Sequence, residues 1–187
     1  MIGNDIVDLS QAAIESNWKR PRFLNKVFTK KEQLLIRTSE DQDDMVWLLW
    51  SMKEAAYKAY VREFKQSFFN PKRIQCQLSL NNQDVVCIDN QTYNLQSIIT
   101  SDYIHSIASK TKFEPQSHFF KVPDRNQSEA LKTKMIHLIS GKIGQNINSI
   151  EIKKTELGVP NLFINNQQIF EALSISHHGK YGAFAIC

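Results

Sequence analysis

The chain of 187 residues is long enough to bury a hydrophobic core, either as one domain or as two small lobes. Hydrophobic residues make up 42% of it and charged residues 22%, a balance that excludes an intrinsically disordered chain. The formal net charge of +4 suits a phosphate-bearing small molecule or an acidic protein partner, and without a long run of like charges it argues against nucleic-acid binding.

The three cysteines, Cys76, Cys87 and Cys187, are widely spaced along the chain. An odd number of cysteines without metal-ligand spacing predicts reduced thiols and a cytoplasmic protein. The first residues have neither the basic start nor the apolar stretch of a signal peptide, and no window is apolar over the length of a membrane span. We therefore expect a cytoplasmic protein with no membrane segment.

The first third of the chain predicts one strand followed by helices. Residues 2–9 form the strand, and Ser10 is a candidate cap for a helix after it. Thr29, with Glu32 three residues later, is a capping-box pattern that begins another helix. Residues 45–64 form a long amphipathic helix, preceded by a run of acids that favours a helix N-terminus. Its apolar stripe consists of Met45, Leu49, Met52, Ala56 and Tyr60, and its polar stripe of Ser51, Glu54, Lys58 and Arg62.

From residue 73 the pattern changes to that of an antiparallel sheet. Apolar and polar residues alternate over residues 73–80, as in a half-buried strand. Asn81 and Asn82 are a turn candidate. Further strands are expected at residues 85–88, 93–99 and 103–108.

A second unit repeats the order of a helix and then strands. Ser128 is a candidate cap for a helix that ends near Gly141 or Gly144. Its expected apolar face consists of Leu131, Met135, Leu138 and Ile139. Strands are expected at residues 149–153, 161–164, 173–177 and 181–186, with a turn at Gly179–Lys180. The chain is therefore predicted to be an α+β protein of two similar α/β lobes, residues 1–112 and 113–187, with antiparallel sheets packed against helices.

Three short motifs carry the chemistry that we expect of the chain. In the first, Gly3 to Asp8, Asp5 lies near small and apolar residues in the first strand. A carboxylate there is a candidate ligand for Mg²⁺, a hard cation that prefers oxygen and keeps several waters. A solvated acid at a strand end is the commoner alternative.

The second motif, Trp50 to Ala59, lies on the long helix. Glu54 and Lys58 are four residues apart and therefore project from the same face. They are either an ordinary surface ion pair, worth about 0.2–0.5 kcal/mol, or a metal ligand and a phosphate-binding cation. The spacing alone does not choose between these alternatives.

The third motif, Leu173 to Tyr181, is a strand followed by a tight turn. Strand alternation places His177 on one face with Leu173 and Ile175. The opposite face carries Ser174, Ser176 and His178. Two histidines and two hydroxyls before a turn can supply several donors to an anion, although a packed edge histidine is the simpler alternative.

Together and in this order, the motifs resemble those of the 4'-phosphopantetheinyl transferases. Residues 3–8 are similar to that family's G-x-D-I-V-E segment, residues 50–58 match W-x-x-K-E-A-x-x-K at every defined position, and residues 174–177 match S-x-S-H. Residues 22–29 also resemble the start of a helix in the holo-acyl-carrier-protein synthase branch. The helix motif is the most specific of these.

The resemblance implies a role for each matching residue. Asp5 and Glu54 would hold Mg²⁺, and Lys58 would contact a phosphate of coenzyme A and stabilise charge as the bond breaks. Ser176 and His177 would bind the nucleotide end of coenzyme A. Asp5, Glu54 and Lys58 are thus the implied catalytic residues, and Glu54 is also a candidate base. The implied reaction moves the phosphopantetheine arm of coenzyme A to a serine of an apo acyl or peptidyl carrier protein and releases adenosine 3',5'-bisphosphate.

Two positions depart from the family's pattern. Val7 stands where the larger branch has an acid, so water or Asp8 would complete the metal shell. Val159 replaces the lysine of a G-K-P turn before the S-x-S-H strand, which removes one expected phosphate contact. The candidates to replace that lysine are Lys153, Lys154 and Lys180.

The order of the motifs implies how the active site is assembled. In the small branch the site forms between subunits of a trimer, and in the large branch between two fused lobes, with the S-x-S-H lobe first. Here the metal-binding lobe comes first, so the resemblance implies a fused pseudo-dimer with its lobes in swapped order, which can act as a monomer. Two alternatives stay open: a non-catalytic module of the same fold that binds coenzyme A or carrier proteins, and a metal-dependent phosphohydrolase.

Overall fold

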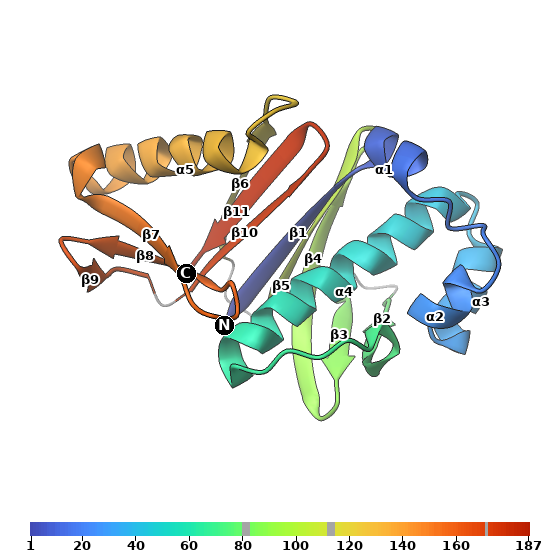
Figure 1. Ribbon diagram of the computed structural model, residues 1–187. Coiled ribbons are helices and arrows are strands. Elements are labelled where there is room, and N and C mark those ends of the chain that lie inside the picture. The colour runs from blue at the N-terminus through green and yellow to red at the C-terminus, as the bar shows by residue number, and fades with distance from the viewer. Residues whose placement is uncertain (80–82, 112–114, 171) are drawn as a thin grey trace.

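The computed structural model describes residues 1–79, 83–111, 115–170 and 172–187 as two lobes that lie side by side (Figure 1). Lobe 1 contains β1 (Ile2–Asp8), α1 (Leu9–Glu15), α2 (Phe23–Val27), α3 (Lys30–Thr38), α4 (Gln42–Phe64), the 3-10 turn η1 (Pro71–Arg73), β2 (Ile74–Gln77), β3 (Val85–Ile88), β4 (Gln91–Ile99) and β5 (Tyr103–Ser109). Lobe 2 contains β6 (Gln116–Lys121), α5 (Gln127–Ile143), η2 (Ile147–Ser149), β7 (Ile150–Lys154), β8 (Pro160–Ile164), β9 (Gln167–Gln168), β10 (Leu173–His178) and β11 (Tyr181–Ile186).

In lobe 1, helix α4 crosses one face of a five-stranded antiparallel sheet with the strand order β1-β5-β4-β3-β2 (Figure 1). The helix begins where Asp41 accepts a hydrogen bond from the backbone N–H of Asp44, and it ends at Lys65 in the left-handed conformation. Gly3 lets β1 approach the helix closely, because a Cβ at this position would lie 2.0 Å from the carbonyl oxygen of Ala55. The first motif therefore needs its glycine for packing.

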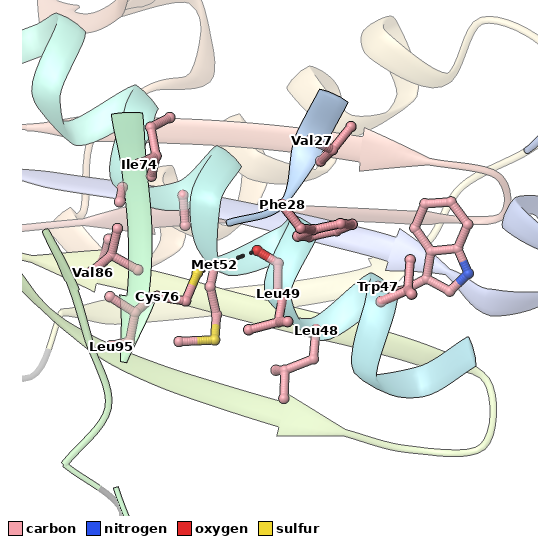
Figure 2. Close-up of a cluster of buried hydrophobic side chains, with 14 of the residues drawn as sticks. Val27, Phe28, Trp47, Leu48, Leu49, Met52, Ile74, Cys76, Val86 and Leu95 are labelled. Carbon is pink, nitrogen blue, oxygen red and sulfur yellow. Dashed lines mark hydrogen bonds between the residues drawn. The ribbon is translucent and has the colours of Figure 1, made fainter. Parts of the chain in front are cut away.

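The core of lobe 1 fills the space between α4, the sheet and the segment before α3. Leu49 and Met52 of α4 meet Phe28 and side chains of the sheet, as Figure 2 shows. The sheet contributes Ile74, Cys76, Val86 and Leu95. Since each fully buried side chain of this size stabilises the fold by about 1.5–3 kcal/mol, the core holds α4 firmly against β1. Residues on α4 are thus fixed relative to the first strand.

Lobe 2 repeats the connectivity of lobe 1. In each lobe the first strand is followed by the main helix and pairs antiparallel with the last strand: β1 with β5, and β6 with β11. The order of the strands in lobe 2 also follows that in lobe 1, except that the strands of lobe 2 form two sheets, β6-β11-β10 and β9-β8-β7. Helix α5 buries Leu131, Met135 and Ile139 against these strands. The expected fold class, a mixture of helices and antiparallel sheets in two similar lobes, agrees with this architecture.

The lobes meet where the outer edge of β1 faces the outer edge of β10. Side chains bridge these edges: the backbone N–H of Asn4 donates to Ser174 Oγ (2.8 Å), and that of Asp8 donates to His178 Nδ1 (3.0 Å). Apolar contacts of Ile2 with Ala185 extend the junction, and the two chain termini lie close together beside it (Figure 1). An edge strand whose donors are satisfied in this way is protected from pairing with other chains.

Several local expectations about helix starts and faces are wrong. Asp8 caps α1, and Ser10 lies inside the helix, where its hydroxyl donates to Asp8 Oδ1. Helix α5 begins at Gln127, after Asn126, so Ser128 is not its cap. Leu138 is 46% exposed because it lies just outside the arc that the buried residues of α5 cover.

Most expected strands agree with the structure to within two residues, but β6 and β9 were not expected. The turn candidate Asn81–Asn82 and the domain boundary at 112/113 lie outside the described residues. The flanking strands β5 and β6 end at Ser109 and begin at Gln116. No helix among the described residues is both long and apolar enough to cross a membrane.

Candidate active site

Asp5, Glu54 and His177 line one cavity of about 430 Å³ between the two lobes. They come from β1, α4 and β10, which are far apart in the sequence. The other lining residues belong to β1, α1, α4, the segment before α3 and the end of β10: Ile6, Val7, Ala12, Glu15, Ser16, Arg20, Phe23, Trp47, Trp50 and His178. The structure therefore brings one residue of each of the three motifs to a single place.

Lys58 does not line this cavity but links α4 to β1 at Asp5, which does. Its ammonium group donates to Asp5 Oδ1 (2.8 Å) and to the backbone carbonyl of Asn4 (3.0 Å). Burial raises the pKa of Asp5 above its ordinary 3.8, although the nearby Lys58 acts in the opposite direction. The ion pair of Glu54 with Lys58, one of the two alternatives for this motif, is absent from the ion pairs of the described residues, since Lys58 is paired with Asp5.

Glu54 is a half-buried carboxyl group that interacts with the carboxyl group of Asp5. Its pKa is raised from 4.5 to about 7, because burial and the charge of Asp5 raise it by more than Lys58 lowers it. A pair of carboxylates in this environment is short of positive charge, because one ammonium group neutralises only one of them. The pair can therefore take up either a proton or a cation at neutral pH.

The donor set of Asp5 and Glu54 fits Mg²⁺. This ion prefers oxygen ligands, and proteins usually hold it by one or two carboxylates, with waters and substrate phosphates completing the octahedron. The described residues contain no group of three or more histidine, cysteine, aspartate or glutamate side chains that could hold a metal. A cation here would thus depend on the substrate for further ligands.

Asp8 is not available as a third ligand. Its Oδ1 accepts hydrogen bonds from Ser10 and from the backbone N–H of Gln11, and its Oδ2 accepts one from the backbone N–H of Lys180 (2.8 Å). Together these bonds lower its pKa despite partial burial. Asp8 therefore caps α1 and fastens the turn between β10 and β11, and it does not line the cavity.

The two residues of the S-x-S-H motif lie in different surroundings. His177 is exposed and lines the cavity. Ser176 is buried, and its hydroxyl accepts a hydrogen bond from Asn4 Nδ2 (3.0 Å). Ser174, Ser176 and His178 share the face that meets β1, as strand alternation predicted. In this structure Ser176 holds the lobes together and is not in the wall of the cavity.

Lys53, the first lysine of the helix motif, supports the fold. Its ammonium group is 2.9 Å from Glu32 Oε1, and both side chains are only 1% exposed. It also donates to the backbone carbonyls of Pro71 and Ile74. Because Lys53 is paired with Glu32 whereas Glu54 lines the cavity, the motif combines a structural residue with residues of the cavity.

Sequence reasoning gave no role to several residues of the cavity, although it named His178 with the third motif as a possible donor to an anion. His178 accepts a hydrogen bond from Asp8 at Nδ1, so its Nε2 carries the proton and faces Glu15 Oε2 at 3.3 Å. Trp50 begins the helix motif and was not given a role, and Arg20 stands in a segment without a motif. The place of Trp50 at the start of the helix motif was the one available signal.

A model of the 4'-phosphopantetheinyl transferase superfamily matches residues 1–108. The chain belongs to this superfamily. The match covers lobe 1 almost completely and includes Asp5, Glu54 and Lys58. Membership of the superfamily supports phosphopantetheinyl transfer as the type of reaction.

Two solved structures are similar to this member of the superfamily. The Helicobacter pylori holo-[acyl-carrier-protein] synthase, in complex with coenzyme A, is 17% identical over 58% of this chain and 98% of its own, with a TM-score of 0.48. The Thermotoga maritima holo-[acyl-carrier-protein] synthase is 11% identical over 89% of this chain and 83% of its own, with a TM-score of 0.44. Among curated proteins no match is found.

Proposed function

We propose that this protein is a 4'-phosphopantetheinyl transferase of the holo-[acyl-carrier-protein] synthase type. It moves the phosphopantetheine arm of coenzyme A to a serine of an apo acyl or peptidyl carrier protein, depends on Mg²⁺, and releases adenosine 3',5'-bisphosphate in the cytoplasm. The observation that carries the proposal is the meeting of Asp5, Glu54 and His177, one from each motif, in the wall of one cavity.

The proposed reaction breaks one P–O bond and forms another. The serine oxygen of the carrier attacks the phosphorus that bears the pantetheine arm, and the bond from that phosphorus to the bridging oxygen of the pyrophosphate breaks. Mg²⁺ held by Asp5 and Glu54 would neutralise charge on the pyrophosphate. Lys58, which already pairs with Asp5, stabilises the negative charge that develops on the leaving nucleotide.

Glu54 is the proposed acceptor of the serine proton. A general base works best when its pKa is near the ambient pH, and that of Glu54 is about 7. Burial and the neighbouring charge of Asp5 are the causes, and this pKa is that of the site without a bound cation, which would lower it. Ser176 and His177 complete the proposed coenzyme A site, His177 by contact and Ser176 by holding β10 against β1.

We propose further that the two lobes are a fused pseudo-dimer, divided near residues 112 and 113, and that a single chain forms the site. Support comes from the repeated connectivity of the lobes and from a cavity whose walls include both α4 of lobe 1 and β10 of lobe 2. The lobes are in the swapped order, with the metal-binding lobe first. An active monomer in gel filtration is the expected result, and activity confined to an obligatory trimer would contradict it.

One observation favours the second candidate, a non-catalytic module that binds coenzyme A or carrier proteins. Val159 stands where the family's G-K-P turn has a lysine, which removes a phosphate contact. Retention of Asp5, Glu54 and Lys58 argues against this candidate, because docking alone requires no pair of half-buried carboxylates.

The test is the mass of an apo carrier protein incubated with this protein, coenzyme A and Mg²⁺. The expected result is a phosphopantetheine increment that is lost with Glu54→Ala and retained with Glu63→Ala. Glu63 is a matched control, since it lies on the same helix but pairs with Lys110 outside the cavity (3.2 Å). Coenzyme A binding without an increment on any of several carriers would favour the docking module, and release of free phosphate would favour a hydrolase.

A further inference from the structure

Strand β10, which carries His177, belongs to a different sheet from β1, and each of the two is an outer strand of its own sheet. In a shared sheet, a ladder of backbone hydrogen bonds would fix their relative position. Here the hydrogen bonds that cross the junction end on side chains, such as the one from Asn4 to Ser174. The position of His177 relative to the residues of β1 therefore depends on side-chain contacts.

Asn4, the neighbour of Asp5 in β1, contacts both sides of this junction. Its backbone carbonyl accepts a hydrogen bond from Lys58 (3.0 Å), and its backbone N–H donates to Ser174 Oγ (2.8 Å). Its side-chain Nδ2 donates to Ser176 Oγ (3.0 Å), and Ser176 is next to His177. The side chain of Asn4 is completely buried. One residue thus links the proposed phosphate-binding cation to the strand of the S-x-S-H motif.

His105 of β5 is the second partner of the Asn4 amide group. Its Nε2 lies 3.3 Å from Asn4 Nδ2, and its side chain is as fully buried as that of Asn4. Burial and then the charge of Lys58 lower the pKa of His105 from 6.5 to about 4, so the ring is neutral at neutral pH. Because an amide nitrogen only donates, the ring accepts at Nε2 and carries its proton at Nδ1. The two hydrogens of the amide group are therefore shared between Ser176 and His105, which fixes its orientation.

Stability alone does not explain this polar pair. Within the described part of the chain, the buried side-chain atoms that lack a hydrogen-bond partner in the protein are Asn4 Oδ1 and His105 Nδ1. Burying a polar atom without such a partner costs free energy, and apolar side chains of similar shape would avoid this cost. Local choices that are unfavourable for folding are typical of functional sites. The pair therefore points to a role in the site that lies beside it.

We infer that Asn4 and His105 are positioning residues for the binding of coenzyme A. His105 orients the amide of Asn4, and that amide holds Ser176. Ser176 in turn sets where His177 lies relative to Lys58. A ligand that contacts both of these groups needs the correct distance between them, since a misplacement of about 1 Å can cost a factor of about 100 in rate. This inference rests on the proposed function, because it takes coenzyme A as the ligand that spans the two groups.

The experiment measures the binding of coenzyme A by calorimetry, in the presence of Mg²⁺, with variants that keep or remove the acceptor at position 105. His105→Phe keeps an aromatic ring but cannot accept from Asn4, and is expected to weaken binding about tenfold. His105→Gln, whose side-chain oxygen can accept this hydrogen bond, should retain most of the affinity. The matched control His118→Phe should bind as the unaltered protein does, because His118 stacks on Phe184 and does not line the cavity.

Two further measurements separate positioning from folding. The double variant Asn4→Leu with His105→Phe removes both buried atoms that lack a partner. It should unfold at no lower urea concentration than the unaltered protein, and yet bind coenzyme A more weakly. In a double-mutant cycle, Asn4→Leu should add little to the effect of His177→Ala, because both act on the same contact. Full additivity in this cycle, or equal weakening by His105→Phe and His105→Gln, would overturn the inference.

The outcomes distinguish this inference from the proposed function. If the unaltered protein modifies a carrier and His105→Phe binds coenzyme A equally tightly, the inference is wrong and the proposed function stands. If the variants weaken binding as expected but no carrier is modified, the inference holds and the proposed activity fails. An unaltered protein that does not bind coenzyme A would contradict both.

Discussion

Replacing Glu54 by glutamine is expected to stabilise the protein at pH 8 but not at pH 4. The pKa of the half-buried Glu54 is about 7 in the folded protein, against 4.5 ordinarily. Below pH 4.5 the carboxyl group is protonated whether the chain is folded or unfolded, so its raised pKa does not lower the free energy of unfolding. As the pH rises towards 7 the unfolded chain releases this proton more readily than the folded one, and the free energy of unfolding falls. The difference between the two pKa values corresponds to about 3 kcal/mol.

The assay is urea unfolding of the unaltered protein and of Glu54→Gln at both pH values, followed by tryptophan fluorescence. The free energy of unfolding of Glu54→Gln should exceed that of the unaltered protein by about 3 kcal/mol more at pH 8 than at pH 4. Glu63→Gln, on the same helix but paired with Lys110 (3.2 Å), should show no such gain. Added Mg²⁺ should stabilise the unaltered protein at pH 8 and have little effect on Glu54→Gln. An identical difference between the two proteins at both pH values would refute the reasoning.

Three further results are expected. Lys53→Met should lower the free energy of unfolding by about 3–5 kcal/mol, because it leaves Glu32 buried without its partner. Adding Glu32→Gln should recover part of this loss. Urea unfolding that shows no loss with Lys53→Met would contradict the structural role of Lys53. Gly3→Ala should lower the melting temperature, since its Cβ would lie 2.0 Å from the Ala55 carbonyl oxygen, whereas Gly141→Ala, with nothing within 4 Å, should raise it slightly. Lys58→Ala should reduce kcat for carrier modification about 100-fold or more; a change confined to KM would assign Lys58 to substrate binding alone.

The local pattern of the sequence was sufficient to predict most of the elements. The capping box of Thr29 and Glu32 is present, with both of its hydrogen bonds. Strand alternation correctly separated His177 from the serines that meet β1, because a period of two depends only on the backbone. Signals that depend on a few neighbouring residues were therefore reliable.

Features that depend on contacts between distant segments were not predictable. Spacing left open whether Glu54 pairs with Lys58, and Lys58 pairs instead with Asp5 of β1, more than fifty residues earlier. The stripe of α4 predicted to be polar is not a solvated face, since Ser51 is buried against β1 and its hydroxyl donates to the carbonyl of Asp5 (3.3 Å). Burial of Lys53 likewise depends on Glu32 of α3, which no helical period reveals.

The central claim is that Asp5 and Glu54 share one divalent cation beside Lys58. A crystal structure of the protein with coenzyme A and Mg²⁺ tests it most directly. The expected result is a single cation about 2.1 Å from an oxygen of each carboxylate, with the pyrophosphate at Lys58 and the nucleotide end towards His177. A cation bound by neither carboxylate, or coenzyme A bound away from this cavity, would contradict the account.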